Sequence, residues 1–150
     1  DYVRSIGSLA GKADIILPNV TEAAILSGLP YQENIDRNYV NQLLNGLNHP
    51  CAVLTGVDFD EDSTGIVLQE GTVQHEYRHK RIGTGCHGTG DIFAAVFTGA
   101  LMQGKNRLDA AKIAADFTCR CIENTVNAPA HWYGVKFEPL LPELMEMLGR

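Results

Sequence analysis

The stretch RIGTGCHGTGDIFAAVFTGALMQG, residues 81–104, sets four glycines ahead of an unbroken apolar helix pattern. The glycines occupy positions 83, 85, 88 and 90, and the helical spacing of apolar residues begins at Ile92. Glycine loses more backbone entropy on folding than any other residue, so this density is expected where the chain takes left-handed dihedrals or admits a ligand closely. We predict a ligand-binding loop that leads into a helix over residues 89–103.

The segment GTGCHGTGD, residues 83–91, is a candidate cradle for phosphate or another anion. A helix N-terminus carries unpaired amides and about half a positive charge from its dipole. Glycines at such a point let an anion approach the backbone. The segment is not a P-loop, because no Gly-Lys-Ser/Thr follows, and its spacing does not fit the dinucleotide-binding fingerprint.

Asp91 stands at the mouth of this helix, where its carboxylate would repel a bound phosphate. One interpretation is chemical: Asp91 accepts the proton of a hydroxyl that attacks a phosphoryl group. The other is structural, because an acidic residue in the first turn complements the helix dipole. The loop and the aspartate alone favour neither interpretation.

Composition restricts the class of protein. The chain has 150 residues, of which 45% are hydrophobic, and a formal net charge of −6. This length can bury a core, and we expect residues 1–150 to form a single domain. The sequence has no basic run for nucleic acid and no apolar run of ~18 residues for a membrane span, and we expect no signal peptide. We therefore expect a cytoplasmic protein without nucleic-acid or membrane partners, whose four cysteines are reduced thiols.

The order of the expected elements indicates an α/β fold. Helices are expected over residues 1–13, 21–28, 36–47, 89–103, 108–127 and 137–148, the second of them capped by Thr21. Residues 14–18 and 51–56 are typical of short buried strands, and residues 64–80 of an antiparallel hairpin that turns at Glu70-Gly71. Two parallel-type strands and a hairpin are few for at least five helices. We therefore expect the chain to be a piece of a longer polypeptide.

Three blocks of the sequence together resemble the ribokinase-like superfamily of small-molecule kinases, and within it the pyridoxal (pyridoxine) kinase family. The blocks are GTGDIFAAVFTGAL (residues 88–101), ADIILPNVTEAAILSG (13–28) and CAVLTGV (51–57). The resemblance extends over essentially the whole chain and corresponds to the C-terminal half of such kinases. It implies the C-terminal part of a three-layer α/β/α fold, with a short central sheet, an antiparallel hairpin and flanking helices.

The resemblance implies a role for the residues of the glycine block. Asp91 would be the catalytic base that deprotonates the substrate hydroxymethyl group. Gly88, Thr89 and Gly90, with the amide of Asp91, would form the anion hole for the phosphoryl group in transfer.

The other blocks imply the remaining contacts with ATP. Asn19 and Glu22 would organise Mg²⁺ around the ATP phosphates, with Glu22 acting through water. Taken alone, Glu22 is more typical of a first-turn acid that stabilises a helix. Thr55 and Gly56 would lie near the phosphates, and Asn127 would help to shape the adenine pocket.

The function that the resemblance implies is ATP- and Mg²⁺-dependent phosphorylation of pyridoxal, pyridoxine or pyridoxamine, with a monovalent-cation requirement left open. One alternative is a hydroxymethylpyrimidine or hydroxymethylpyrimidine-phosphate kinase, which shares the fold and the loop. Another is a nucleotide-binding fragment without turnover. Because a missing half would expose the edge of residues 14–17, we also expect a homo-oligomer or pairing with another chain.

Overall fold

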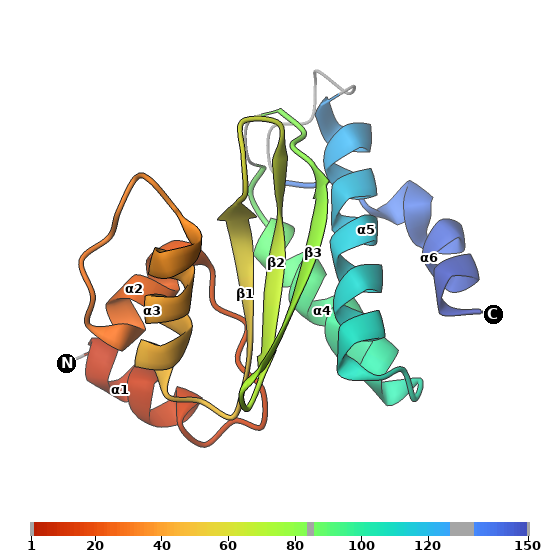
Figure 1. The fold of residues 1–150 in the computed structure, drawn as a ribbon. Coiled ribbons are helices and arrows are strands. Elements are labelled where there is room, and N and C mark those ends of the chain that lie inside the picture. The colour runs from red at the N-terminus through yellow and green to blue at the C-terminus, as the bar shows by residue number, and fades with distance from the viewer. Residues whose placement is uncertain (1, 84–85, 127–133, 150) are drawn as a thin grey trace. The chain divides into compact units, whose positions relative to one another are not determined.

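The computed structural model describes residues 2–83, 86–126 and 134–149 (Figure 1). They fall into two compact units, Asp1–Lys80 and Arg81–Arg150. The elements of the first unit are α1 (Tyr2–Ala10), α2 (Val20–Ser27), α3 (Arg37–Leu47), β1 (Cys51–Asp58), β2 (Ser63–Glu70) and β3 (Val73–Lys80). Those of the second are α4 (Thr89–Met102), α5 (Arg107–Val126), a 3-10 turn (Glu138–Leu140) and α6 (Leu141–Leu148).

The first unit is built on an antiparallel sheet in the order β1-β2-β3. Thr55 of β1 lies opposite Ile66 of β2, which in turn lies opposite Tyr77 of β3. The turn between β2 and β3 contains Gly71, whose φ of +58° is left-handed, a conformation that glycine adopts without strain. The predicted α/β class and the predicted hairpin over residues 64–80 are confirmed.

Residues 14–18 do not form the full strand that the sequence predicts. Two isolated parallel bridges join this stretch and the next residue to β1, at Ile16 and at Asn19. Ile16 donates to β1 at 3.1 Å and accepts from it at 2.8 Å, and the Pro18 carbonyl accepts a β1 amide at 2.9 Å. A regular ladder stops here because proline has no N–H and Asn19 already begins the next helix. β1 therefore has a parallel neighbour on one side and antiparallel β2 on the other.

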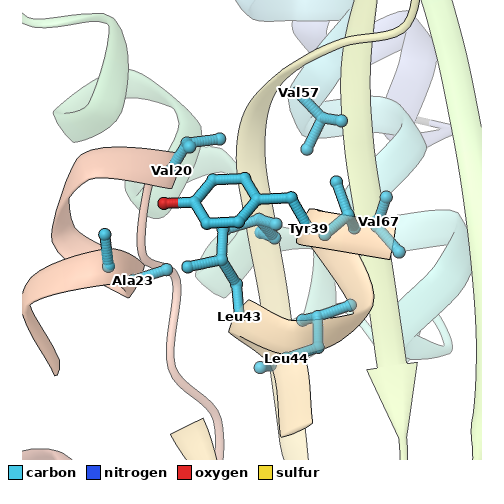
Figure 2. Close-up of a cluster of buried hydrophobic side chains, with 11 residues drawn as sticks. Val20, Ala23, Tyr39, Leu43, Leu44, Val57 and Val67 are labelled. Atoms are coloured by element: carbon cyan, nitrogen blue, oxygen red, sulfur yellow. The ribbon is translucent and has the colours of Figure 1, made fainter. Parts of the chain in front are cut away.

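The core of the first unit lies between α2, α3 and one face of the sheet (Figure 2). Tyr39 is only 1% exposed, and its hydroxyl donates to the carbonyl of Pro30 at 2.9 Å, which satisfies the one polar atom of that side chain. The side chains that surround it come from α2, α3 and the sheet: Val20, Ala23, Leu43, Leu44, Val57 and Val67.

In the second unit, α4 and α5 pack against each other. Phe93 and Phe97 of α4 stack their rings against each other, with the ring centroids 6.2 Å apart. α6 is tied to α5 by an ion pair between Arg120 and Glu143, at 2.8 Å. Among the described residues, no helix is both long and apolar enough to cross a membrane.

Candidate phosphate-binding site

The first turn of α4 leaves its backbone donors without a cap from within the described protein. The N-cap residue is Gly88, with a left-handed φ of +84°, and no side chain of the described residues caps the helix. The first intrahelical bond joins the amide of Ile92 to the carbonyl of Gly88. An α-helix cannot supply partners for the amides before that point, which here belong to Thr89, Gly90 and Asp91. Three N–H groups therefore converge at a helix N-terminus, an arrangement that attracts anions.

The side-chain position of Gly90 on this turn is not filled by the described parts of the protein. Among the described residues, a Cβ built on Gly90 would meet no atom outside its own stretch of helix within 4 Å, so their packing does not explain the glycine. The Asp91 side chain is exposed on the same turn. The turn thus combines donors for an oxyanion with one carboxylate that can accept a proton.

A second set of predicted residues meets in the second half of β1, where the parallel pairing ends. The backbones of Asn19 and Thr55 pair in a parallel bridge, and the Thr55 hydroxyl lies 3.4 Å from the carbonyl of Pro18. Gly56 follows with a φ of +67°, in the irregularity between Thr55 and Val57. A bulge bends the strand locally and changes the direction in which the side chain at that point is aimed. The carboxyl ends of parallel-paired segments are the usual ligand position in open α/β sheets.

Asn19 and Glu22 form a reciprocal capping box at the start of α2. The Glu22 amide donates to Asn19 Oδ1 at 2.8 Å, and the Asn19 amide donates to Glu22 Oε2 at 2.9 Å. The prediction that Thr21 caps this helix is therefore wrong. The reason is that a capping box needs an acid three residues after the cap, which Asn19 has in Glu22 and Thr21 lacks.

The capping box bears on the predicted magnesium role. It uses Oε2 of Glu22 and leaves the second carboxylate oxygen of this exposed side chain for a water molecule or an ion. Within the described parts of the chain, no group of three or more His, Cys, Asp or Glu side chains could hold a metal. Mg²⁺ keeps most of its waters and needs few protein ligands, so one carboxylate fits an indirect role.

The second unit contains an open pocket of about 530 Å³ beside the end of α5. It combines apolar side chains, an amide and an ion pair: Ile82, Val126, Leu140, Asn124, Arg120 and Glu123, with Gly83. The Arg120 guanidinium donates to Glu123 at 3.0 Å. Asn127, the predicted adenine-pocket residue, lies outside the described residues. The pocket nevertheless includes the helix end that precedes it.

Sequence reasoning missed one set of contacts that reaches the α4 turn. The amide of Val135 donates to the carbonyl of His87 at 3.1 Å. The amide of Lys136 donates to the Thr125 hydroxyl at 2.8 Å. These bonds join α5 to the residue before the Gly88 cap. No motif in the sequence signals them, because they pair backbone groups that only the folded chain brings together.

The cysteines of α5 are unsuited to nucleophilic chemistry. Burial raises the pKa of Cys119 to about 12, and the nearby carboxylate of Asp116 adds to the shift. Burial and then the charge of Glu143 raise the pKa of Cys121 to about 11. Thiols with such pKa values stay protonated at neutral pH. None of the four cysteines is part of a disulfide, which agrees with the expected reduced thiols.

This α/β fold, with its glycine-opened helix and first-turn aspartate, is that of the ribokinase-like superfamily of kinases. The chain belongs to the phosphomethylpyrimidine kinase family, whose family model matches residues 1–135.

Curated and solved relatives agree with this assignment. The hydroxymethylpyrimidine/phosphomethylpyrimidine kinase of Bacillus subtilis is 31% identical over 113 residues, which cover 74% of this chain and 42% of that protein. The crystal structure of pyridoxal kinase from Lactobacillus plantarum matches with a TM-score of 0.83 and 29% identity, over 97% of this chain and 54% of that one. Pyridoxal kinase from Leishmania donovani, in complex with ADP and pyridoxamine, shares the fold with a TM-score of 0.80 and 20% identity, over 95% of this chain and 52% of that one.

The chain thus spans about half the length, or less, of the proteins it matches. The predicted relationship to ribokinase-like kinases is confirmed. The relatives include both pyridoxal kinases and pyrimidine kinases, so the pyrimidine alternative is supported as well as the pyridoxal one.

Proposed function

We propose that the chain is the phosphate-binding part of a kinase that transfers the γ-phosphoryl group of ATP to a ring-borne hydroxymethyl group. The observation that carries the proposal is the α4 turn, where a left-handed Gly88 leaves three amides without a side-chain cap beside the exposed carboxylate of Asp91. Kinase relatives and the ADP held by a protein of this fold support ATP as the donor.

The reaction follows from these groups. Asp91 accepts the proton of the hydroxymethyl group, the oxygen attacks the γ-phosphorus, and ADP leaves with the electrons of the broken P–O bond. The amides of Thr89, Gly90 and Asp91 donate to the phosphoryl oxygens as charge develops on them. Removing one such donor typically costs about 3 kcal/mol of transition-state stabilisation.

The remaining predicted residues serve the donor. Mg²⁺, when bound, neutralises charge on the ATP phosphates, and Glu22 would hold one of its waters while Asn19 fixes the Glu22 carboxylate. Thr55 and Gly56 would lie beside the phosphates, because they follow the segment that pairs with Asn19. The pocket at the end of α5, with its apolar walls and the Asn124 amide, would receive the adenine ring.

Two classes of acceptor compete. A vitamin B6 ring (pyridoxal, pyridoxine or pyridoxamine) follows from the resemblance of the motifs and from the solved pyridoxal kinases. A hydroxymethylpyrimidine is favoured by the family match and by the Bacillus subtilis relative. Both acceptors present a hydroxymethyl group on a planar nitrogen ring, so the same α4 turn would serve either. A cytoplasmic location, where ATP is abundant and thiols stay reduced, belongs to the same proposal.

The experiment has two stages. Calorimetric titration with ATP and Mg²⁺ tests donor binding, and an assay of ADP release with each of the two acceptor classes tests transfer. Saturable binding with transfer to one class supports the proposal and identifies the acceptor. Binding without transfer supports a nucleotide-binding fragment that does not turn over. A chain that binds no nucleotide would contradict the proposal.

We also propose that another polypeptide segment, or a second copy of the chain, covers an apolar groove on the first unit. The groove, of about 420 Å³, is lined mainly by Val3, Ile6, Leu17, Ile25 and Leu26. The backbone groups of Ile16 and the carbonyl of Pro18 hydrogen-bond to β1. Because backbone groups alternate in direction along an extended segment, the N–H and C=O of Leu17 point away from β1. An apolar groove beside such backbone groups is a surface on which a further strand can pair.

A further inference from the structure

Two side chains at the end of α5 hydrogen-bond to the backbone of Lys136, one to its N–H and one to its C=O. The Thr125 hydroxyl donates to the carbonyl of Cys121 at 2.6 Å and accepts the amide of Lys136 at 2.8 Å. The side-chain amide of Asn124 donates to the Lys136 carbonyl at 3.0 Å. Thr125 is 7% exposed, so little water competes for its hydroxyl. The Lys136 backbone is therefore fixed to the last turn of the helix.

Val135, the next residue back along the chain, carries this attachment to the α4 turn. Its amide donates to the carbonyl of His87 at 3.1 Å, and its side chain is buried. A Cβ built on Gly88 would lie 3.9 Å from a methyl group of Val135. His87 directly precedes Gly88, so the Val135 amide fixes the peptide that enters the left-handed cap of α4.

We propose that Thr125 is a positioning residue that orients the amides of the α4 turn through Lys136, Val135 and His87. The inference rests on the proposed function, because it gives those amides the task of binding the phosphoryl group. The physical argument is that a glycine cap without a side-chain bond does not define its own geometry. The hydrogen bonds from Thr125 and Asn124 to Lys136 supply a constraint that the turn itself lacks. This matters because oxyanion binding depends on donors that are held in place beforehand.

The helix offers a matched control in Thr118. Its hydroxyl donates to the carbonyl of Ala114 at 2.7 Å, and it is 9% exposed. It therefore repeats the burial and the intrahelical bond of Thr125. For Thr118, the structure describes no hydrogen bond to residues 134–136. Valine at either position removes one buried hydroxyl at nearly constant volume, and only valine at 125 removes the link to Lys136.

The first readout needs no ligand. Amide resonances of the uniformly ¹⁵N-labelled protein are compared for Thr125→Val, Thr118→Val and the wild type, and amide hydrogen exchange is measured for Val135. We expect Thr125→Val to shift the signals of Gly88, Gly90 and Asp91 and to speed exchange at Val135 by about tenfold or more. Thr118→Val leaves those signals in place. Thr125→Ser, which keeps the hydroxyl, restores them.

The second readout is binding of ATP with Mg²⁺ by calorimetry. We expect Thr125→Val to weaken binding by about tenfold, and Thr118→Val and Thr125→Ser to bind like the wild type. If Thr125→Val does not fold, Thr125→Ala replaces it, since it also removes the bond to Lys136.

The outcomes separate this inference from the proposed function. Equal α4 amide signals in Thr125→Val and Thr118→Val overturn the positioning role, whatever the protein binds. Shifted signals with unchanged ATP affinity also overturn it. A wild type that binds no nucleotide contradicts the proposed function, and the amide signals alone then decide whether Thr125 holds the turn.

Discussion

Asn19 and Glu22 hydrogen-bond each other in both directions, through bonds of 2.8 and 2.9 Å between backbone amides and side-chain oxygens. This relationship gives one pair of residues two separable properties. The capping geometry depends on oxygen acceptors, whereas attraction of magnesium depends on the negative charge. A substitution that keeps the acceptor and removes the charge distinguishes the two.

Glu22→Gln is that substitution. Glutamine also completes a capping box, so we expect the free energy of unfolding to change by less than about 0.5 kcal/mol. Affinity for ATP at fixed Mg²⁺ should fall about three- to tenfold, because a charge that holds a metal-bound water is lost. Asp36→Asn is the control, since the Asp36 carboxylate also accepts a backbone amide at the start of a helix, that of Tyr39 in α3. Equal calorimetric affinities in the two variants would mean that Glu22 only caps the helix.

Asp91→Asn tests the catalytic base. The rate of transfer should fall by about 10²- to 10⁴-fold, while ATP affinity stays near that of the wild type. Loss of the first-turn charge should also cost about 0.3–1 kcal/mol of stability. Asp109→Asn removes the corresponding first-turn acid of α5 and should cost similar stability with no loss of rate. Steady-state kinetics and thermal unfolding measure both effects, and an Asp91→Asn protein with most of its activity would refute the assignment.

Gly90→Ala tests whether the open space at the α4 turn belongs to a ligand. In the described parts of the chain, the new methyl group meets no atom outside its own helix within 4 Å, so the fold should tolerate it. Alanine is about 0.5–1 kcal/mol more favourable than glycine inside a helix, so the melting temperature should not fall. ATP affinity should fall at least about tenfold, because the methyl occupies the approach to the amides. Gly99→Ala, equally open and on the same helix, should leave affinity unchanged.

The thiols of α5 predict a stability that falls in alkaline solution. Folding raises the pKa of Cys121 from 9.0 to about 11 and that of Cys119 from 9.0 to about 12. Between pH 9 and 11 the unfolded chain loses these protons while the folded chain keeps them, so the free energy of unfolding decreases as pH rises. Urea unfolding at several pH values should show a smaller alkaline decrease in the Cys119→Ala/Cys121→Ala variant. An identical pH dependence in both proteins would contradict the prediction.

Ile25→Glu tests the apolar groove. Ile25 is 54% exposed and lines the groove, so a charge there should weaken association while changing stability little. Val73→Glu places the same charge at a position that is 52% exposed on β3 and outside the groove. Light scattering over a range of concentrations should show weaker association in the Ile25 variant alone. Strictly monomeric wild-type protein would exclude a second copy of the chain as the partner in this groove.

Long periodic segments of the chain could be predicted well from the sequence. The two helices expected over residues 89–103 and 108–127 are observed as Thr89–Met102 and Arg107–Val126, because apolar spacing over several turns leaves little choice. The turn of the hairpin was also predictable, since Gly71 supplies the left-handed residue that it needs.

The remaining predictions were limited because neighbouring residues favour different local structures. Asn19 and Thr21 are both good N-caps, and only the position of Glu22 decides between them. Residues 14–18 have the composition of a strand, yet Pro18 interrupts the ladder after Ile16. In the candidate site, the glycines and Asp91 stand out in the sequence. The bond between Thr125 and Lys136 does not, because it depends on how the folded chain returns to the helix end.

The uncapped start of α4 couples ligand occupancy to the folding of the helix. A phosphate bound at the amides of Thr89, Gly90 and Asp91 would itself act as the N-cap that Gly88 does not provide. Nucleotide should then raise the melting temperature, because it adds the cap that this turn lacks. Mutational gains in helix stability at this turn would come at the expense of the ligand, since a serine or aspartate cap would compete for the same donors.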